Sequence, residues 1–206
     1  VTGASVGIGA AFARRLAHDG YDLSLVARNK RQLEQLAEEL ASAHGIHAKA
    51  VPADLTDKKE RLEVEHALAH DGHLDLLVNN AGFGTIGTFA SLDADREEEE
   101  IRLNVVALTR LTRAALPGMI RRGHGGVINV SSLAGLTPSP YNATYGATKA
   151  FVNSFSEALY EELRGSGVRV MALCPGFTRT EFQDRAGIDT SGIPALAWMT
   201  AEAVVD

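Results

Sequence analysis

Cysteine, aromatic residues and long apolar runs are scarce in this 206-residue chain, and each shortage excludes a class of protein. The single cysteine, Cys174, excludes an internal disulfide. No charge-free apolar run reaches about 18 residues, so the sequence predicts no membrane span. The chain has 20 Lys and Arg against 26 Asp and Glu, which gives a net charge of −6. This acidic balance argues against a nucleic-acid partner or an anionic membrane surface.

The sequence also lacks a spacing of residues that is typical of a metal site. Among the seven histidines, only His66 and His70 share a helical spacing of four. No third ligand lies near them in the sequence, so we predict no metal site.

The overall composition is that of a globular protein. Apolar residues make up 45% of the chain and charged residues 22%, which excludes global disorder. The length suits one domain, so we predict a single unit over residues 1–206. A cytoplasmic location agrees with the sparse cysteine, although that shortage is weak evidence.

Short apolar runs alternate with helical patterns along the chain. In Arg31–His44 and Ile8–His18 apolar residues recur at helical spacing. The predicted strands are nearly continuous apolar runs, as buried parallel strands are: Asp22–Arg28, Ile46–Val51, Leu74–Asn79, Gly126–Val130 and Val168–Cys174. Glycines predicted to end the helices in left-handed conformations are Gly20, Gly45, Gly72, Gly123 and Gly165. This order predicts an α/β fold, a Rossmann-like doubly wound parallel sheet in three α/β/α layers.

The one charge block is Glu97-Glu98-Glu99-Glu100, with Arg96 and Arg102 beside it. We interpret it as a solvated helix face rather than an interaction tail.

A glycine-rich turn, Thr2–Gly9, leads directly into the first predicted helix. Glycine permits a tight turn and a close approach of the backbone to a diphosphate, and the helix N-terminus offers N–H groups to the anion. A generic strand-to-helix turn with incidental glycines is the alternative that the spacing leaves open.

The end of the next strand indicates which dinucleotide would bind. Selectivity for an unphosphorylated ribose calls for an acid about 20 residues after the turn. The sequence there is Val26-Ala27-Arg28-Asn29, without an acid. Arg28 could meet a 2′-phosphate with its forked donors, and Ser5 could add a hydroxyl. We therefore predict NADP(H), with a solvated strand-end arginine as the alternative for Arg28.

Tyr145 and Lys149 lie four residues apart and share one helix face. An ammonium beside a phenol stabilises the phenolate and lowers its pKa, which suits acid–base chemistry. One exposed ammonium is insufficient, so the pair needs a dry cofactor pocket around it. Ser132 follows a predicted strand at its carboxyl end, where ligands bind in α/β sheets. An accidental surface pair is the alternative.

These residues resemble the classical short-chain dehydrogenase/reductase family. The resemblance covers nearly the whole chain and rests on motifs in the family's order: Thr2–Gly9, Asn79-Asn80-Ala81-Gly82, Asn104, Ser132, Tyr145 with Lys149, and Pro175-Gly176 with Thr180. It implies an NADP-preferring oxidoreductase that interconverts a carbonyl and a secondary alcohol by hydride transfer.

The resemblance also implies a role for each site residue. Tyr145 would be the general acid in reduction and the base in oxidation, Ser132 would orient the carbonyl oxygen, and Lys149 would lower the tyrosine's pKa and hold the ribose. Asn104 would hold a water that links Lys149 to solvent. Asp54 would contact the adenine and Thr180 the carboxamide. The full cofactor set is Gly3, Ser5, Gly7, Ile8, Gly9, Arg28, Asp54, Leu55, Asn80, Ala81, Gly82, Tyr145, Lys149, Pro175, Gly176, Thr178 and Thr180.

Three of these residues have structural alternatives. Asn104 could fill a helix bend, Asp54 could serve a turn or helix start, and Thr180 could cap a helix.

Compared with the family, both ends look cut, because most of the first strand and the last helix and strand are absent. Residues 177–200 would cover the substrate. Their apolar side chains, with Phe83 and Tyr141 on the other wall, suit an apolar carbonyl substrate, or they anchor the cover to the core: Phe177, Phe182, Ile188, Ile193, Pro194, Leu196, Trp198 and Met199. Arg179 or Arg185 could instead meet an acidic substrate, but surface arginines are the simpler interpretation.

Two other functions compete with a carbonyl reductase. A nucleotide-sugar epimerase or dehydratase of the extended type would need another glycine spacing and a longer chain. A non-catalytic NADP sensor or scaffold would commonly have lost the Tyr or Lys present here. The family also implies a homodimer or homotetramer.

Overall fold

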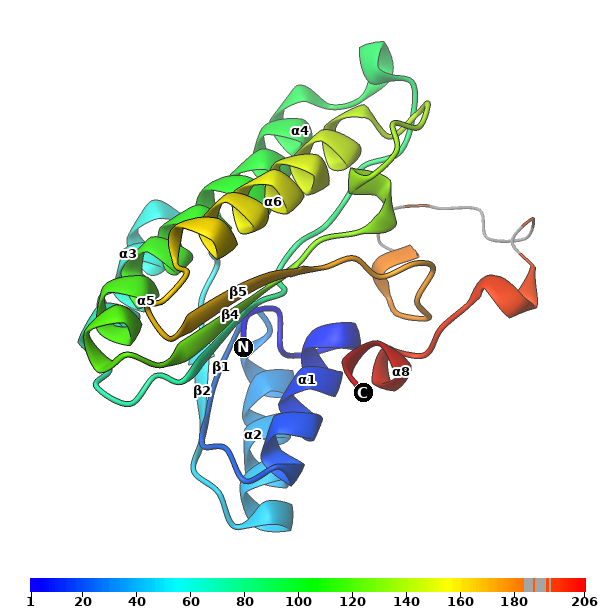
Figure 1. Cartoon of the computed structure of the whole chain (residues 1–206). Coiled ribbons are helices and arrows are strands. Elements are labelled where there is room, and N and C mark those ends of the chain that lie inside the picture. The colour runs from blue at the N-terminus through cyan, green and yellow to red at the C-terminus, as the bar shows by residue number, and fades with distance from the viewer. Residues whose placement is uncertain (184–186, 188–191, 193) are drawn as a thin grey trace. The chain divides into compact units, whose positions relative to one another are not determined.

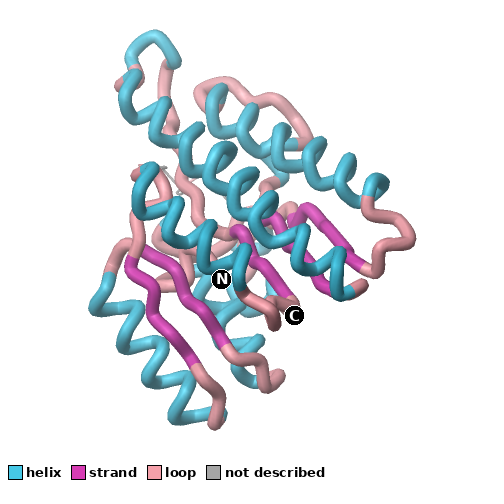
Figure 2. The backbone as a smooth tube through the Cα atoms, turned by 90° about the vertical axis from the view of Figure 1, so that its left-hand side faces the viewer, coloured by secondary structure: helices cyan, strands magenta, loops and turns pink. Residues whose placement is uncertain are grey.

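Two compact units make up the chain in the computed structural model, which describes residues 1–183, 187, 192 and 194–206. Unit 1 comprises Val1–Asp54 and Gly176–Asp206, and unit 2 comprises Leu55–Pro175. In each unit parallel strands run side by side and helices join them (Figure 2). None of the helices in the described ranges is long and apolar enough to cross a membrane.

Unit 1 contains a parallel pair of strands, β1 (Leu23–Ala27) and β2 (Ala48–Pro52). Its helices are α1 (Gly7–His18), α2 (Lys30–His44) and the short α8 (Ala201–Val205), with a 3-10 turn at Ala195–Ala197. Val1 and Thr2 lie beside β1, because the Val26 amide donates to the Val1 carbonyl at 2.9 Å. The core beneath is aliphatic, with Leu25 and Leu33 fully buried. The chain therefore enters the glycine-rich turn from a parallel strand position.

Unit 2 contains three parallel strands in the order β3 (Leu76–Asn79), β4 (Gly125–Val130) and β5 (Val168–Leu173). Figure 1 shows α5 and α6 over the same face of β4 and β5. The helices of this unit are α3 (Lys58–His70), α4 (Ala94–Ile101), α5 (Leu108–Arg122) and α6 (Ala143–Glu162), with a π-helical segment, η2 (Arg102–Ala107), and 3-10 turns η1 (Phe89–Ser91) and η3 (Leu133–Gly135).

A ladder of buried polar side chains crosses unit 2. The Asn79 amide donates to Thr112 Oγ1 and to Asn129 Oδ1, both at 2.9 Å. Asn129 in turn donates to Ser156 Oγ at 2.9 Å. The ladder joins β3 and β4 to α5 and α6, and all four side chains are buried. Buried polar groups are expensive unless paired, so these contacts favour one arrangement of the four elements.

The five predicted strands and the alternation with helices are confirmed, with boundaries that differ by a few residues. Gly45 and Gly123 end α2 and α5 in the left-handed region, at φ 69° and 72°. The prediction for Gly72 is wrong, because α3 ends at Asp71 with extended backbone. The prediction that every strand is buried is also wrong for β2, none of whose residues is fully buried. In unit 1 the strand β2 pairs only with β1, which leaves it less covered than a central strand.

Candidate active site

The glycine-rich turn of unit 1 has the geometry of an anion site. Gly3 and Gly7 adopt positive φ values, 62° and 56°, that side chains disfavour. Val6, at the N-cap of α1, makes no side-chain cap hydrogen bond, so its side chain does not occupy the first N–H groups of the helix. Such a terminus attracts a phosphate through its N–H groups and its dipole. Ile8 and Gly9 continue the first turn, and Ser5 is half-buried beside it. These residues fit the predicted diphosphate.

Gly7 and Thr180 lie close together within unit 1. A Cβ at Gly7 would come within 3.0 Å of Thr180 Cγ2, so only glycine fits there. Both residues line a hollow of about 570 Å³, together with Arg14 and Thr200. Thr180 Oγ1 also accepts a hydrogen bond from the Phe182 amide at 3.2 Å. Thr180 therefore caps the Phe182 amide. The family resemblance expects the same residue to contact the nicotinamide carboxamide.

Arg28 and Asp54 follow the ends of β1 and β2 and approach each other. The guanidinium Nη1 is 3.9 Å from Asp54 Oδ2, and the Arg28 side chain is 62% exposed. Asn29, the last residue of the stretch that lacks an acid, accepts from the Gln32 amide and caps α2. The observed start of α3 is capped by Asp57, so Asp54 does not serve as that cap.

In unit 2 the predicted site residues follow the carboxyl ends of its strands. Asn80-Ala81-Gly82 follow β3, Ser132 follows β4, and Pro175 follows β5. The Leu133 amide donates to the Pro175 carbonyl at 3.1 Å, which ties two of these ends together. Ser132 Oγ accepts from the Ala134 amide at 3.1 Å and starts the turn η3. Leu55 is buried at the start of the unit. Gly176 and Thr178 lie in unit 1, where Thr178 Oγ1 donates to the Gly176 carbonyl.

Tyr145 and Lys149 share one face of α6, as the spacing predicts. Lys149 is 6% exposed, and its Nζ donates to the Val130 carbonyl at 2.8 Å. The same Nζ is 5.6 Å from the centroid of the Tyr145 ring. Burial lowers the pKa of Lys149 to about 8, against the opposite pull of the Glu100 and Cys174 charges. The buried Lys149 ammonium is shielded from water. Its pKa therefore responds strongly to nearby charge.

The pKa of Tyr145 moves opposite to the direction expected from the sequence. Burial raises the pKa to about 12, the negative charge of Glu100 adds to the rise, and a hydrogen bond with Ser132 only partly offsets it. The lowering by Lys149 that is expected once a cofactor surrounds the pair stays a prediction. Desolvation of the phenolate outweighs the neighbouring cation. In this state the phenol keeps its proton at neutral pH.

Asn104 lies in the π-helical segment η2 and fastens the loop after β3. Its amide donates to the Phe83 carbonyl at 2.8 Å and to Thr148 Oγ1 at 3.1 Å, and its Oδ1 accepts from the Phe83 amide at 3.2 Å. A Cβ at Gly82 would meet Asn104 Oδ1 at 2.9 Å and Lys149 Nζ at 3.6 Å. Gly82 thus leaves space beside both polar groups. π-helical turns are rare and recur at functional sites.

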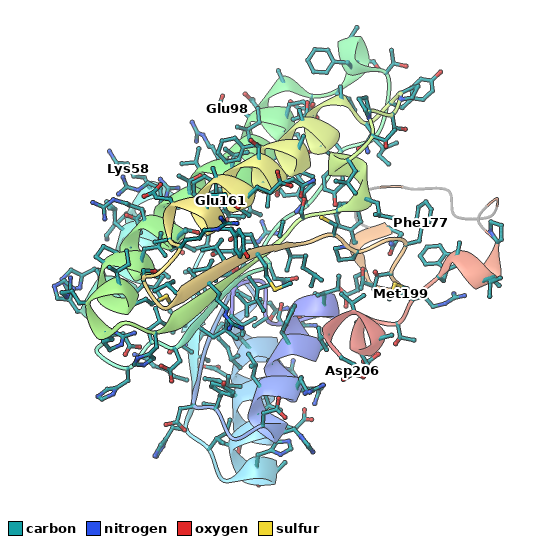
Figure 3. The ribbon with its side chains drawn as sticks, viewed as in Figure 1. Lys58, Glu98, Glu161, Phe177, Met199 and Asp206 are labelled. Atoms are coloured by element: carbon teal, nitrogen blue, oxygen red, sulfur yellow. The ribbon has the colours of Figure 1, made fainter. Side chains whose placement is uncertain are left out.

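Two glutamates of the acidic run lie inside unit 2. Glu98 is exposed on α4 (Figure 3), but Glu100 is fully buried and Glu97 is 8% exposed. The prediction of a solvated face is therefore wrong for Glu97 and Glu100. Spacings of three and four residues put Glu97, Glu100 and Asn104 on one side of the helix. This pattern is present in the sequence, but the run of four glutamates makes it hard to recognise.

The covering segment is described only in part, and Ile188, Ile193 and Arg185 lie outside the described residues. Phe177 and Met199 pair through their backbones: the Met199 amide donates to the Phe177 carbonyl at 2.8 Å (Figure 3). The rings of Phe177 and Trp198 lie 5.6 Å apart, and the Arg179 guanidinium stacks over Trp198. Phe177, Leu196 and Met199 remain exposed.

Known proteins match this chain along most of its length. The family described as short chain dehydrogenase matches residues 1–190. A short-chain dehydrogenase from Sphingobium yanoikuyae, solved with NADPH, is 43% identical over all of this chain and 80% of its own, with a TM-score of 0.96. A bulky-bulky ketone specific alcohol dehydrogenase from Comamonas testosteroni is 36% identical over all of this chain and 78% of its own, with a TM-score of 0.90.

Among curated proteins, the very-long-chain 3-oxoacyl-CoA reductase of Anas platyrhynchos is 34% identical over 88% of this chain. The match spans only 59% of the duck protein's length.

These matches define the class of protein first: an oxidoreductase that acts on carbonyl and alcohol groups with a nicotinamide cofactor. The chain belongs to the short-chain dehydrogenase family. The predicted family, the Rossmann-like α/β fold and the enzyme class are thereby confirmed.

Proposed function

We propose that this protein reduces a ketone with a large apolar substituent to a secondary alcohol, with NADPH as the cofactor. The observation that carries the proposal is the placement of Ser132, Tyr145, Lys149 and Asn104 on the elements of unit 2, with Tyr145 protonated at neutral pH. The absence of an acid after β1 and the presence of Arg28 favour the phosphorylated dinucleotide. The Sphingobium relative was solved with NADPH, which supports the same choice.

The cofactor would supply a hydride to the carbonyl carbon of the substrate. Ser132 would hydrogen-bond the carbonyl oxygen, and the Tyr145 hydroxyl would donate its proton to that oxygen as the negative charge develops. Lys149, held by the Val130 carbonyl, would stabilise the resulting phenolate through its positive charge. The proton would return to Tyr145 by way of Lys149, and Asn104 would hold the water that links Lys149 to solvent.

Each unit by itself offers groups that would suit a dinucleotide. The uncapped start of α1 and the positive-φ glycines Gly3 and Gly7 would take the diphosphate. Arg28 would take the 2′-phosphate, which offers its guanidinium more charge than Asp54 does. Gly82 would let a ribose hydroxyl reach Lys149 Nζ.

The apolar character of the substrate rests on the covering segment. Phe177, Trp198 and Met199 present apolar surface, and Leu196 is 99% exposed. Exposed apolar groups on a segment of this kind gain by contact with an apolar ligand. The Comamonas relative is named for bulky ketones and the duck relative for long-chain 3-oxoacyl substrates, which supports a large substituent.

Ketones that differ only in size test this proposal. NADPH oxidation would be followed at saturating cofactor with a methyl ketone series from acetone to a long-chain or aryl ketone. We expect kcat/KM to rise at least about tenfold along the series, since each buried methylene contributes about 0.8 kcal/mol. A flat or falling series would overturn the apolar substrate class, and the absence of turnover with any ketone would overturn the reductase assignment and favour the sensor alternative.

The assembly, the single-domain division and the cytoplasmic location stay proposals. Apolar side chains on the helices of unit 2 favour a homodimer or homotetramer: Ile101, Val106 and Phe151 are exposed, and Phe151 stacks on Phe155. Sedimentation or light scattering would determine the assembly.

A further inference from the structure

Glu100 is a buried carboxyl that the reaction described above does not use. None of its surface is exposed. Its Oε2 accepts two hydrogen bonds at 2.8 Å, from the amide and from the hydroxyl of Thr85. Its Oε1 is buried and has no hydrogen-bond partner among the described residues. A buried carboxylate satisfied on one side only is expensive, so a structural role alone does not explain why an acid stands here.

Hydrogen bonds connect Glu100 to the start of α6. Thr85 Oγ1 also lies within hydrogen-bond distance of Glu97, so its one proton is given to either of the two carboxyl groups at a time, and Thr144 Oγ1 donates to the other oxygen of Glu97. Thr144 directly precedes Tyr145, and α4 packs against α6. Glu100 therefore lies at the end of a chain of polar contacts that leads to the residue before Tyr145.

The charged groups around Glu100 come from four places. On its own helix, Glu97 is a second acid; from α6, Tyr145 and Lys149 feel its charge. Arg102 of η2 pairs with the exposed Glu98 at 2.5 Å instead. Cys174, after β5, acts on Lys149 in the same direction as Glu100. Lys149 is thus the cation among the groups that interact with Glu100.

We propose that Glu100 is a positioning residue that keeps protons on both Tyr145 and Lys149 and so biases the site toward carbonyl reduction. A negative charge near a phenol favours the neutral phenol, and near an amine it favours the ammonium. The charge of Glu100 therefore favours the protonated form of both groups. The proposal rests on the function proposed above.

The bias depends on the ionisation of Glu100 itself. Burial raises the pKa of Glu100 to about 7, against the two Thr85 hydrogen bonds that lower it. The negative charge therefore forms as the pH rises through about 7, below the pH at which Lys149 would lose its proton. Glu100 thus opposes the loss of protons from the pair in the range where that loss begins.

The test is the pH dependence of ketone reduction in the E100Q variant. Glutamine keeps the size of the side chain and an acceptor for Thr85 but removes the charge. We expect the midpoint of the alkaline limb of kcat/KM to move down by about one pH unit. E98Q removes a neighbouring but exposed charge from the same helix and should leave the midpoint in place. E100D keeps the charge and should retain the midpoint of the unchanged enzyme even if its kcat falls.

A second readout does not need turnover. In protein labelled with 13C-lysine, with the Lys149 signal assigned by Lys149→Met, E100Q should lower the Lys149 titration midpoint by about one pH unit. If E100Q does not fold, Thr85→Val gives the same direction with a smaller shift, because it removes a hydrogen bond to the Glu100 anion. An unmoved Lys149 midpoint, or equal shifts in E100Q and E100D, would overturn the proposal. Failure of every ketone with an intact Lys149 shift would instead overturn the proposed function.

Discussion

The candidate functional groups of the two units differ in physical kind. In unit 1 the candidate binding groups are backbone N–H groups at the start of α1, shaped by Gly3 and Gly7. In unit 2 they are buried or half-buried side chains on α4 and α6 whose proton affinities are shifted by burial and by one another. Binding by backbone N–H groups depends on the local conformation of the chain. Proton transfer by titratable side chains depends on the charges near them. Variants in unit 1 should therefore change cofactor binding, and variants in unit 2 should change proton transfer.

The largest effect is expected for Tyr145→Phe, which removes the proton donor and keeps the ring. Turnover should fall by about 10²- to 10⁴-fold, the usual contribution of a general acid. NADPH affinity, measured by fluorescence titration, should stay within about threefold. Tyr160→Phe, which changes an exposed tyrosine near the other end of α6, should leave both unchanged. A Tyr145→Phe enzyme that still reduces ketones would remove Tyr145 from its role.

Gly7→Val should weaken NADPH binding about tenfold or more. The added side chain would need a positive φ and would press on Thr180 at 3.0 Å, so the start of α1 would shift. Gly20→Val is the matched control, because Gly20 also has a positive φ, 85°, with open space around it. It should lower the melting temperature but leave the NADPH dissociation constant in place. Equal effects of the two variants on binding would contradict the close-approach role of Gly7.

Arg28→Asp should shift the cofactor preference toward NADH by about tenfold in the ratio of kcat/KM values. The carboxylate would repel a 2′-phosphate and accept from a ribose hydroxyl. Arg121→Asp, an exposed arginine at the end of α5, supplies the same charge change in unit 2 and should not alter the ratio. An unchanged ratio in Arg28→Asp would assign the selectivity to another residue.

The smallest effect is a pH dependence of the unmodified enzyme. Lys149 has a lowered pKa of about 8, so its positive charge is present below that pH and is lost above it. Ketone reduction should therefore fall by about fivefold between pH 8 and pH 9. Circular dichroism at each pH would show that the fold persists. A rate that stays level to pH 10 would mean that the buried ammonium does not take part.

The sequence predicted the secondary structure well, because secondary structure depends on local patterns. Nearly continuous apolar runs identified the strands and apolar residues at helical spacing identified the helices, and Tyr145 with Lys149 lie on one helix face because four residues make about one turn. Gly3 and Gly7 of the turn at Thr2–Gly9 do adopt positive φ values that other residues disfavour.

The sequence could not predict the properties that depend on packing between distant residues. A run of four glutamates indicates a wet surface, yet Glu100 is fully buried because α4 turns that face inward. The π-helical segment around Asn104 has no marker in the residue pattern. The raised pKa of Tyr145 depends on how much water the fold excludes, which a pairwise spacing does not report.

The polar ladder has a further consequence for the accuracy with which β3 and β4 pair during folding. Its members are Asn79, Thr112, Asn129 and Ser156. A one-residue slip of β4 against β3 would turn Asn129 to the opposite side of the sheet and leave the Asn79 amide and the Ser156 hydroxyl without their Asn129 partner. Misregistered forms are therefore penalised during folding. The register of β3 against β4 therefore stays fixed. The positions from which the loops at Asn80 and Ser131 begin are fixed with it.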